Sequence, residues 1–431
     1  MKIIRFLSHL INSLLNGKSF FGLVSNFFFN FFPVLLWLIL FKNASLIPVN
    51  WRPKINIKWL PYADNLCFNP LLLSSYIFYL LIILFFILPF SYFLLKINKN
   101  KLLFALLIFS CPLLNLVNYL ASINQNFKLD LLSFISYVLL HLIIPILTSI
   151  YLYLFQIPGI LSCYSWSLGL QNILGLITHL ILPSSPPWFI HLNGINSIAD
   201  YSTLGYAAGL TRIDTSFGNH LTTNGFHKSP IVFGALPSLH SAMAFLTCIF
   251  ISYFSNSSFL SILSIFYVLL QWFSTIYLDH HWRLDLFVGM CYSIVSFSII
   301  KILNHSIFNY NSNYNSNSNH NLIDYNKSNI TNSNLEFSST DTLFNYNDND
   351  NDNDNFDLEL QSFNDDYNHN NSSSSSLTAI SNNENLVTID NHNNNKITKF
   401  CSNVFANTQP TDMRPAGLRI FSGTLLESLF T

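Results

Sequence analysis

Charged residues are scarce in this chain. Of its 431 residues only 10% are Asp, Glu, Lys or Arg, whereas 51% are hydrophobic and 41 are phenylalanine. A soluble domain usually carries about 25% charged residues. The formal net charge is −1, so the composition predicts no nucleic-acid partner. The shortage of charge instead indicates a protein that lies in a membrane.

Cysteine pairs at CxxC spacing are also missing. The six cysteines are scattered, mostly within apolar runs, so they are predicted to be small core residues. They are Cys67, Cys111, Cys163, Cys248, Cys291 and Cys401. No small-residue cleavage site follows the short apolar stretch after Met1, and the first membrane helix is therefore expected to act as an uncleaved anchor.

The apolar residues gather in runs long enough to cross a bilayer, which takes about 20 residues per helix. The fold class is therefore predicted to be all-α, a polytopic bundle of about eight spans. The expected spans are 20–41, 71–95, 102–120, 130–156, 160–182, 240–255, 259–278 and 284–304. Ahead of them lies a mixed N-terminal segment, 1–19, and the first helices occupy 20–156.

The span at 160–182 carries a polar stripe that includes Ser165, Gln171 and Asn172. Polar side chains in a spanning helix face other helices or a cavity, so contact between helices and contact with a substrate both stay open. The following segment, 183–235, is the longest connection between spans and is rich in Gly, Asn, Ser and Thr. It is predicted to be a lid or binding loop.

Composition changes near residue 305, where Asn, Ser and Asp begin to dominate. Such a segment buries too little apolar area to offset the entropy of ordering it, so 305–431 is predicted to be a disordered tail. A mildly apolar patch, 418–430, is either a short contact motif or part of that disorder.

Two polar clusters interrupt the last apolar runs and are the candidates for chemistry. The first is Pro237-Ser238-Leu239-His240-Ser241, in which Ser238 is expected to cap a helix and place His240 in its first turn. The second runs from Ser274 to Asp285 and includes Asp279-His280-His281-Trp282-Arg283-Leu284-Asp285. His281 and Asp285 are four residues apart, a spacing that places both on one helical face.

These residues predict catalysis at phosphorus. Asp285 would fix the tautomer of His281, which would attack phosphorus while His240 protonates the departing oxygen. A second alcohol or water would then resolve the phosphohistidine. No metal or other cofactor is required, and no further ligands at helical spacing accompany the two histidines. His280 points about 100° away from His281 on a helix and is predicted to be a wall residue or an interface partner, not the nucleophile.

The spacings Pro-Ser-x-His and Ser-Thr-x5-His-x3-Asp resemble the second and third signatures of the type 2 phosphatidic acid phosphatase superfamily. Residues 233–241 and 274–281, with Pro186-Pro187-Trp188 and 209–214 before them, are similar to fungal-type inositol phosphorylceramide synthases. The resemblance covers roughly 160–300. It implies a PAP2-like six-helix catalytic core in 157–304, with the loop 183–235 on the lumenal side of the Golgi membrane.

The resemblance also implies the reaction, transfer of phosphoinositol from phosphatidylinositol to the hydroxyl of ceramide with release of diacylglycerol. His240, His281 and Asp285 become the predicted catalytic residues, and Ser238, Ser241 and Arg212 the predicted substrate-binding residues. The expected partners are membrane lipids, and a regulatory membrane subunit is left open. The chain departs from the superfamily in lacking its first signature, and Thr275 stands where many phosphatases have an arginine.

The alternatives are a lipid phosphate phosphatase, a transferase of another ceramide head group, and a non-catalytic membrane scaffold. The missing first signature disfavours simple hydrolysis, and the intact histidines and aspartate disfavour a scaffold. Tyr277, Trp272 and Trp282 are predicted to be interfacial aromatics. Four other histidines are predicted to be loop or rim residues and not ligands, and among them only His227 lies close enough in sequence to the first cluster to be worth testing. They are His179, His191, His220 and His227.

Overall fold

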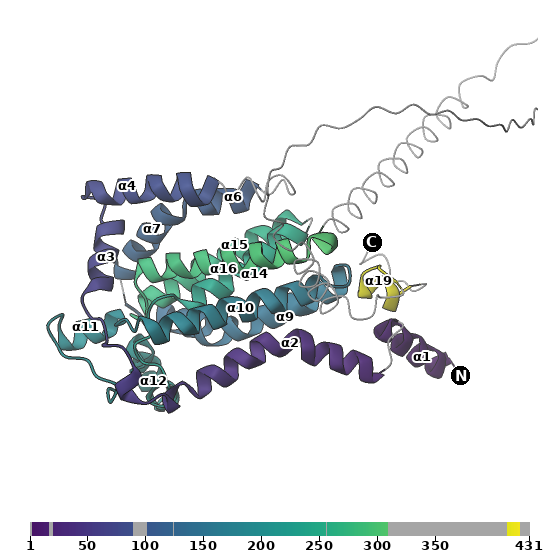
Figure 1. Cartoon of the computed structure of the whole chain (residues 1–431), viewed down its shortest axis with the longest axis horizontal. Coiled ribbons are helices and arrows are strands. Elements are labelled where there is room, and N and C mark those ends of the chain that lie inside the picture. Colours follow the sequence, from purple (N-terminus) through teal and green to yellow (C-terminus); the bar gives the residue numbers. More distant parts are fainter. Residues whose placement is uncertain are drawn as a thin grey trace, which may run out of the picture. The chain divides into compact units, whose positions relative to one another are not determined.

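The structure, a computed structural model, describes residues 2–16, 20–88, 101–123, 125–255, 257–308 and 412–422. Within these ranges the chain is helical, and β-type pairing is limited to two isolated bridges. The prediction of an all-α membrane bundle is confirmed (Figure 1). The longer helices are α1 (Lys2–Leu15), α2 (Phe20–Lys42), α3 (Trp59–Phe68), α4 (Leu73–Ile82), α6 (Lys101–Ile108), α7 (Ser110–Ile123), α8 (Phe127–Phe134), α9 (His141–Phe155), α10 (Ile160–Ile181), α14 (Leu239–Phe254), α15 (Ser258–Tyr277) and α16 (Arg283–Leu303).

Shorter elements fill the connections. The short α-helices are α11 (Pro187–Asn193), α12 (Thr211–Ser216), α13 (Leu221–His227) and α19 (Ala416–Ile420). Three 3₁₀ turns are η1 (Ala44–Leu46), η2 (Val49–Trp51) and η5 (Ala208–Leu210), and two π-helical segments are η3 (Ile83–Ile87) and η4 (Ile135–Leu140).

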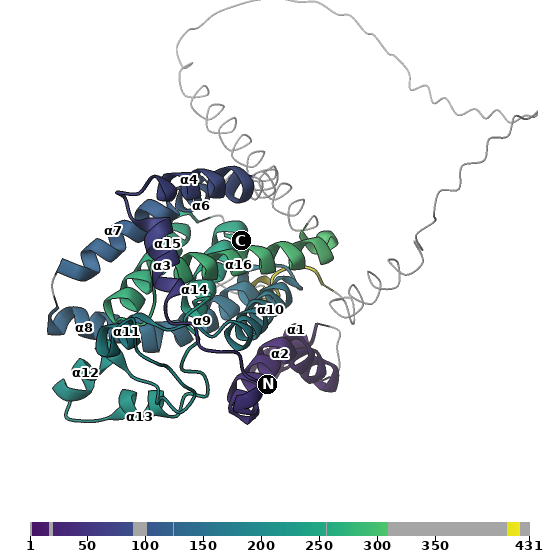
Figure 2. The same cartoon turned by 60° about the vertical axis from the view of Figure 1, so that its left-hand side comes forward.

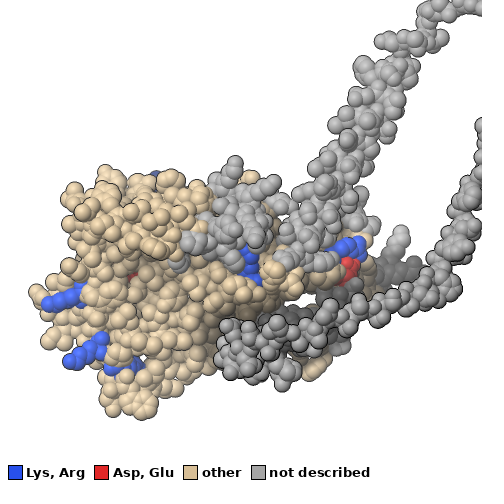
Figure 3. Space-filling view, turned by 45° about the horizontal axis from the view of Figure 1, so that its top comes forward, with Lys and Arg blue, Asp and Glu red and all other residues tan. Residues whose placement is uncertain are grey.

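Five described helices are long and apolar enough to cross a membrane: Phe21–Lys42, Phe127–Phe155, Ile160–Ile181, Ser258–Tyr277 and Arg283–Leu303. A sixth would be the pair Trp59–Phe68 and Leu73–Phe85, which is bent by 84°. The expected span 102–120 divides between α6 and α7, and α14 has only 16 residues. The number eight therefore stays a prediction. The face shown in Figure 3 carries few charged side chains, as a bilayer requires.

Helix α14 lies at the centre of the bundle. Every residue from Ser241 to Phe254 is buried, and the helix contacts α9, α10, α15 and α16. A helix that is apolar on all sides is stable only when other helices surround it. His240 stands at the start of this central helix, so any residue that reaches it must come from the surrounding helices or from the loops above.

Three loops meet over the start of α14. Ser184 pairs in parallel with both Asn56 and Gly234. The bonds are Asn56 N–H to Pro183 O at 2.9 Å and Ser184 N–H to Phe233 O at 2.7 Å. A further loop joins where Trp188 N–H donates to Asp279 O at 3.1 Å. We call residues 42–58, 183–235 and 278–282 the loop layer; its helices α11 and α12 lie at one end of the bundle in both views (Figures 1 and 2).

A buried ion pair fixes the start of α16. Asp64, on α3, accepts hydrogen bonds from Arg283 Nε at 3.1 Å and Nη2 at 2.7 Å, and from the backbone N–H of Leu284 at 2.8 Å. The last bond satisfies one of the N–H groups that every helix start leaves open. Arg283 also donates to Asn115 Oδ1 at 2.8 Å. The chain's N-terminal half thus holds the helix that carries Asp285.

Most of the predicted disordered tail, 305–431, lies outside the described residues. The described parts, 305–308 and 412–422, are folded: the first continues from α16, and the second contains α19, which packs against α1 and α9. Within the patch 418–430, residues 418–422 therefore make contacts, as one of the two readings of that patch proposed. Figure 1 shows α1 and α19 at the end of the bundle opposite α11 and α12.

Replacing Asp64 by Asn is expected to lower the free energy of unfolding by about 3–5 kcal/mol, because Arg283 would keep a largely buried charge without its partner. Thermal unfolding of the purified protein in detergent measures the loss. The matched control removes both charges, Asp64→Leu with Arg283→Met, and is expected to unfold close to the unaltered protein. An Asp64→Asn variant as stable as the parent would contradict this account of α16.

Candidate active site

His281 and Asp285 form a buried hydrogen-bonded pair. His281 Nδ1 lies 3.0 Å from Asp285 Oδ2, and the two side chains are 9% and 0% exposed. A carboxylate at this distance holds the proton on Nδ1 and leaves the Nε2 lone pair free. Helix α16 begins at Arg283, so His281 lies in the loop just before the helix and not on its face. The predicted contact forms nonetheless.

His240 lies beside this pair, with its ring centroid 6.0 Å from that of His281. Ser238 caps α14 as predicted, because its side chain accepts a hydrogen bond from the Ser241 N–H at 3.4 Å. The cap places His240 in the first turn. The structure therefore brings His240, His281 and Asp285 together from two segments about forty residues apart in the sequence.

The starts of α14 and α16 are held in close contact by small residues. Ser238 N–H donates to Asp285 O at 2.9 Å, and Ser241 Oγ donates to Leu286 O at 2.6 Å. A Cβ on Gly289 would lie 2.2 Å from Ser238 O, so only glycine permits this approach. Ser241 Oγ also accepts from Trp272 Nε1 at 2.8 Å. These bonds give Ser238 and Ser241 structural roles. Trp272, which was predicted to be an interfacial aromatic, is instead buried and hydrogen-bonded to Ser241.

Tyr137 and His141 complete the surroundings of His240, and sequence reasoning missed both. Tyr137 stacks on His240 with centroids 4.1 Å apart, and the His141 ring lies 4.4 Å away. Tyr137 belongs to the π-helical segment η4, and His141 follows it directly. Such segments often occur at functional sites. The available signal was a histidine inside an apolar span, which usually marks function.

His280 is a wall of the site, as predicted. Its ring lies between Tyr137 and Phe226, with both centroid distances 4.9 Å. Burial lowers the pKa of His280 to about 3, since the site offers no charge to stabilise the protonated ring. The ring is therefore neutral at physiological pH and leaves acid–base chemistry to its neighbours.

Arg212, the predicted substrate-binding cation, is partly engaged by other residues of the protein. Arg212 Nε donates to Asp130 Oδ1 at 2.7 Å, and its guanidinium lies over the Tyr277 ring, 5.2 Å from the centroid. Its Nη2, although buried, has no hydrogen-bond partner among the described residues, so Arg212 keeps a donor that a phosphate could use. Arg283 belongs to the Asp64 pair. Tyr277, predicted to be interfacial, instead donates to Asp130 at 3.0 Å and is buried.

The remaining histidines are found in different surroundings, some buried and some exposed. His179, expected at the rim, is buried, and its Nε2 donates to Pro237 O at 2.9 Å, directly before the capped start of α14. His191 is exposed and lies 2.8 Å from Asp279. The polar stripe of α10 divides: Ser165 donates to Asn30 O, a contact between helices, whereas Gln171 and Asn172 are buried without a partner among the described residues.

The site thus brings together two histidines, one of them paired with a carboxylate, beside the capped start of α14. The family comparison agrees with this geometry: residues 113–299 match the PAP2 superfamily. The match begins earlier than the predicted 160–300 and includes Tyr137 and His141.

The chain is also similar to fungal proteins whose names refer to inositol phosphate transfer. Inositolphosphotransferase 1 of Saccharomyces cerevisiae is 39% identical, with 57% of each chain covered. The inositol phosphorylceramide synthase catalytic subunit of Schizosaccharomyces pombe is 31% identical over 62% of this chain and 53% of its own. The inositol phosphorylceramide synthase of Candida albicans is 30% identical over 65% and 49%. The chain spans about half the length of the curated relatives it matches, and no solved structure matches it.

Replacing Gly289 by Ala is expected to separate the starts of α14 and α16 and to destabilise the protein by about 1–3 kcal/mol, because the added methyl meets backbone. Thermal unfolding in detergent measures it. Gly225→Ala is the control, since a Cβ there meets nothing within 4 Å. Equal stability of the two variants would show that α14 and α16 do not depend on this contact.

His280→Phe is expected to make the protein less sensitive to acid. The pKa of His280 in the folded protein, about 3, lies below its ordinary value of 6.5. The unfolded protein therefore binds a proton at His280 more readily, and the free energy of unfolding decreases as the pH falls from 6.5 towards 3. Phenylalanine keeps the stacking and cannot be protonated. Unfolding midpoints measured at intervals across this pH range test the slope, with exposed His227→Gln as control. An unchanged slope for His280→Phe would refute the neutral assignment.

Proposed function

We propose that the chain is an inositol phosphorylceramide synthase, which transfers phosphoinositol from phosphatidylinositol to the hydroxyl of ceramide and releases diacylglycerol. The observation that carries the proposal is the buried His281–Asp285 pair with His240 at 6.0 Å. The names of the similar proteins support the choice of phosphoinositol as the group transferred. The apolar helices around the site suit substrates that stay in the membrane.

In the first half of the reaction His281 Nε2 attacks phosphorus. The bond from phosphorus to the diacylglycerol oxygen breaks, and protonated His240 gives its proton to that oxygen. Phosphoinositol is then held on His281 as a phosphohistidine. Asp285 accepts the Nδ1–H throughout and stabilises the positive charge that the ring gains in the attack.

In the second half the ceramide hydroxyl gives its proton to the neutral His240 and attacks phosphorus. The phosphorus–nitrogen bond breaks, and both histidines return to their starting states. The ring of Tyr137 stacks on His240, and His280 in turn stacks on Tyr137, so this stack of rings restricts the contact of His240 with water on that side. This enclosure favours a lipid hydroxyl over water as acceptor, since an exposed intermediate would be hydrolysed.

Phosphate binding falls to the capped start of α14 and to Arg212. The first-turn N–H groups of a helix attract anions, although α14 uses that of Ser241 in its own cap. Ser238 and Ser241 act through this geometry, because their side chains are fully buried. Arg212 has a buried donor to spare at Nη2. It would replace the cations of the superfamily's missing first signature.

We place the enzyme in the Golgi membrane, with the loop layer and the site facing the lumen and the termini in the cytosol. The loops that carry both clusters share one end of the bundle, and α1 and α19 lie at the other (Figure 1). A regulatory membrane subunit fits as well, because the Schizosaccharomyces pombe and Saccharomyces cerevisiae synthases are named as catalytic subunits.

A second candidate is transfer of phosphoinositol to an acceptor other than ceramide. The relative with 39% identity, above the 30–31% of the named synthases, is called an inositolphosphotransferase, a name that specifies the group and not the acceptor. The proposed chemistry at His281 is the same for both acceptors. The two candidates would differ in the hydroxyl compound that attacks the phosphohistidine in the second half of the reaction.

The discriminating experiment gives purified protein phosphatidylinositol labelled in its inositol, with ceramide, with a sphingolipid fraction freed of ceramide, or with neither. Labelled inositol phosphorylceramide formed only with ceramide is the expected result. Product formed only with the ceramide-free fraction would favour the second candidate. Release of water-soluble inositol phosphate at the same rate in all three would identify hydrolysis, with water as the acceptor, in place of transfer.

Variants test the roles in the same assay. His281→Gln and Asp285→Asn are expected to lower kcat about a thousandfold or more while the protein stays folded. His280→Phe, the adjacent-residue control, is expected to retain most activity. Full activity of His281→Gln would refute the phosphohistidine route.

A further inference from the structure

A cavity of about 830 Å³ lies between α1, α2, α9, α10 and the segment 412–422. Its lining is mainly apolar and includes Leu23, Phe31, Ile150 and Leu161. Pockets of this size and character hold small organic ligands and often lie between the helices of bundles. Because these helices are apolar enough to lie in a bilayer, lipid chains are the apolar molecules at hand.

The cavity is remote from the histidines. It is lined by Gly159 and Leu161 at the start of α10, whereas His179 near the end of that helix bonds the residue before Ser238. At 1.5 Å per residue, the 22 residues of α10 separate its two ends by about 33 Å. The cavity is therefore not part of the candidate active site.

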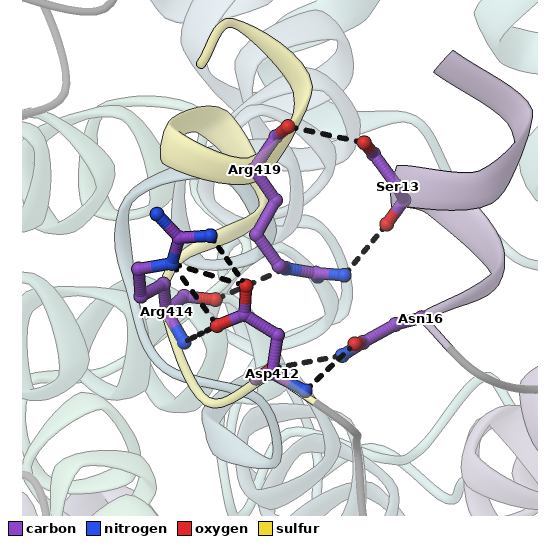
Figure 4. Close-up of polar contacts among 5 residues, drawn as sticks. All are labelled: Ser13, Asn16, Asp412, Arg414 and Arg419. Atoms are coloured by element: carbon purple, nitrogen blue, oxygen red, sulfur yellow. Dashed lines mark hydrogen bonds and ion pairs between the residues drawn. The ribbon is translucent and has the colours of Figure 1, made fainter. Parts of the chain in front are cut away.

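A buried cation stands at its wall. Arg419, on α19, is 7% exposed and lines the cavity. Its Nη1 donates to Ser13 O at 2.6 Å and its Nε to Arg414 O at 3.1 Å (Figure 4). Both acceptors are neutral carbonyls. Burial lowers the pKa of Arg419, as expected for a cation removed from water.

The acidic residue nearest to Arg419 is Asp412, which is paired with another residue. Asp412 forms an ion pair with Arg414 at 2.7 Å and accepts from both Nε and Nη2 of that side chain. Its backbone is bonded to Asn16, which directly follows α1 (Figure 4). No carboxylate of the described residues lies within ion-pair distance of Arg419. The charge of Asp412 and a hydrogen bond with Tyr153 favour the protonated form of Arg419, but burial outweighs them and lowers its pKa. A buried cation without an ion-pair partner is costly, and an anion bound in the cavity would lower that cost.

We propose that this cavity binds one anionic phospholipid, with its phosphate at Arg419 and acyl chain between α2, α9 and α10. The cavity supplies an apolar slot for the acyl chain of the lipid, and the charge of Arg419 selects an anionic head group. Since Met413, Ala416 and Arg419 all come from 412–422, the lipid would also fasten this C-terminal segment to the bundle. The site is independent of the proposed transfer reaction.

The test uses purified full-length protein in detergent with photoactivatable phosphatidylglycerol or phosphatidylcholine of identical chains. After irradiation and digestion, mass spectrometry measures labelling of the peptides from α9 and the start of α10. Phosphatidylglycerol is expected to label them about tenfold more than phosphatidylcholine, the effect of one charge-assisted contact. Equal labelling by both lipids would overturn the proposal.

Variants distinguish the contribution of the Arg419 charge from that of the apolar cavity. Arg419→Gln is expected to abolish the preference for phosphatidylglycerol, and Arg419→Lys to keep most of it. Leu161→Trp adds bulk inside the cavity and is expected to lower labelling by phosphatidylglycerol about tenfold, even if Arg419→Gln releases α19. Lys54→Gln, which removes an exposed charge from the loop layer, is the control and is expected to change nothing. Labelling by phosphatidylglycerol that survives either Arg419→Gln or Leu161→Trp unchanged would mean that only lipid bound non-specifically to the protein surface was captured, and would overturn the proposal.

Discussion

At Gly289 the backbones of α14 and α16 come so close that a methyl group there would lie 2.2 Å from Ser238 O. This contact sets the distance between the two histidines, because His240 and Asp285 stand in the first turns of the two helices. Ser238 and Ser241 bond across it, and Asp64 holds the start of α16 from outside. A polar site within an apolar bundle is thus built mainly from backbone bonds and small residues.

The surroundings of His240 follow from its position at the start of a helix that is buried on all sides. Only neighbouring helices and loops can reach it, and they present the rings of Tyr137, His141 and, across Tyr137, His280. These rings enclose the histidine without engaging it in an ion pair. An acid–base group in such a place can change protonation state during a reaction, which a group locked to a carboxylate could not do readily.

Local patterns in the sequence predicted the bundle and the core of the site. The Ser238 cap and the His281–Asp285 pair depend on residues three or four positions apart, so spacing alone indicates them. Tyr137 and His141 lie about a hundred residues from His240, and their role depends on tertiary packing and on a π-helical turn that no pattern signalled. Contacts between distant segments were missed for the same reason: Asp64 with Arg283, Arg212 with Asp130, and Arg419 with Ser13.

The bridges that join Asn56, Ser184 and Gly234 consist of backbone N–H and C=O groups. Substitutions in these loops would therefore leave the bonds in place at most positions, so related enzymes could diverge there in substrate preference while keeping the same scaffold. Gly234 is an exception, since a Cβ would lie 2.8 Å from Ile231 and 3.1 Å from the His179 ring. Gly205 and Gly209 are further exceptions, since a Cβ there would lie 2.2 Å from Phe226 O and 2.8 Å from Leu278 Cα. The side chains of these loops can therefore vary at most positions, whereas the backbone tolerates no added side chain at these glycines.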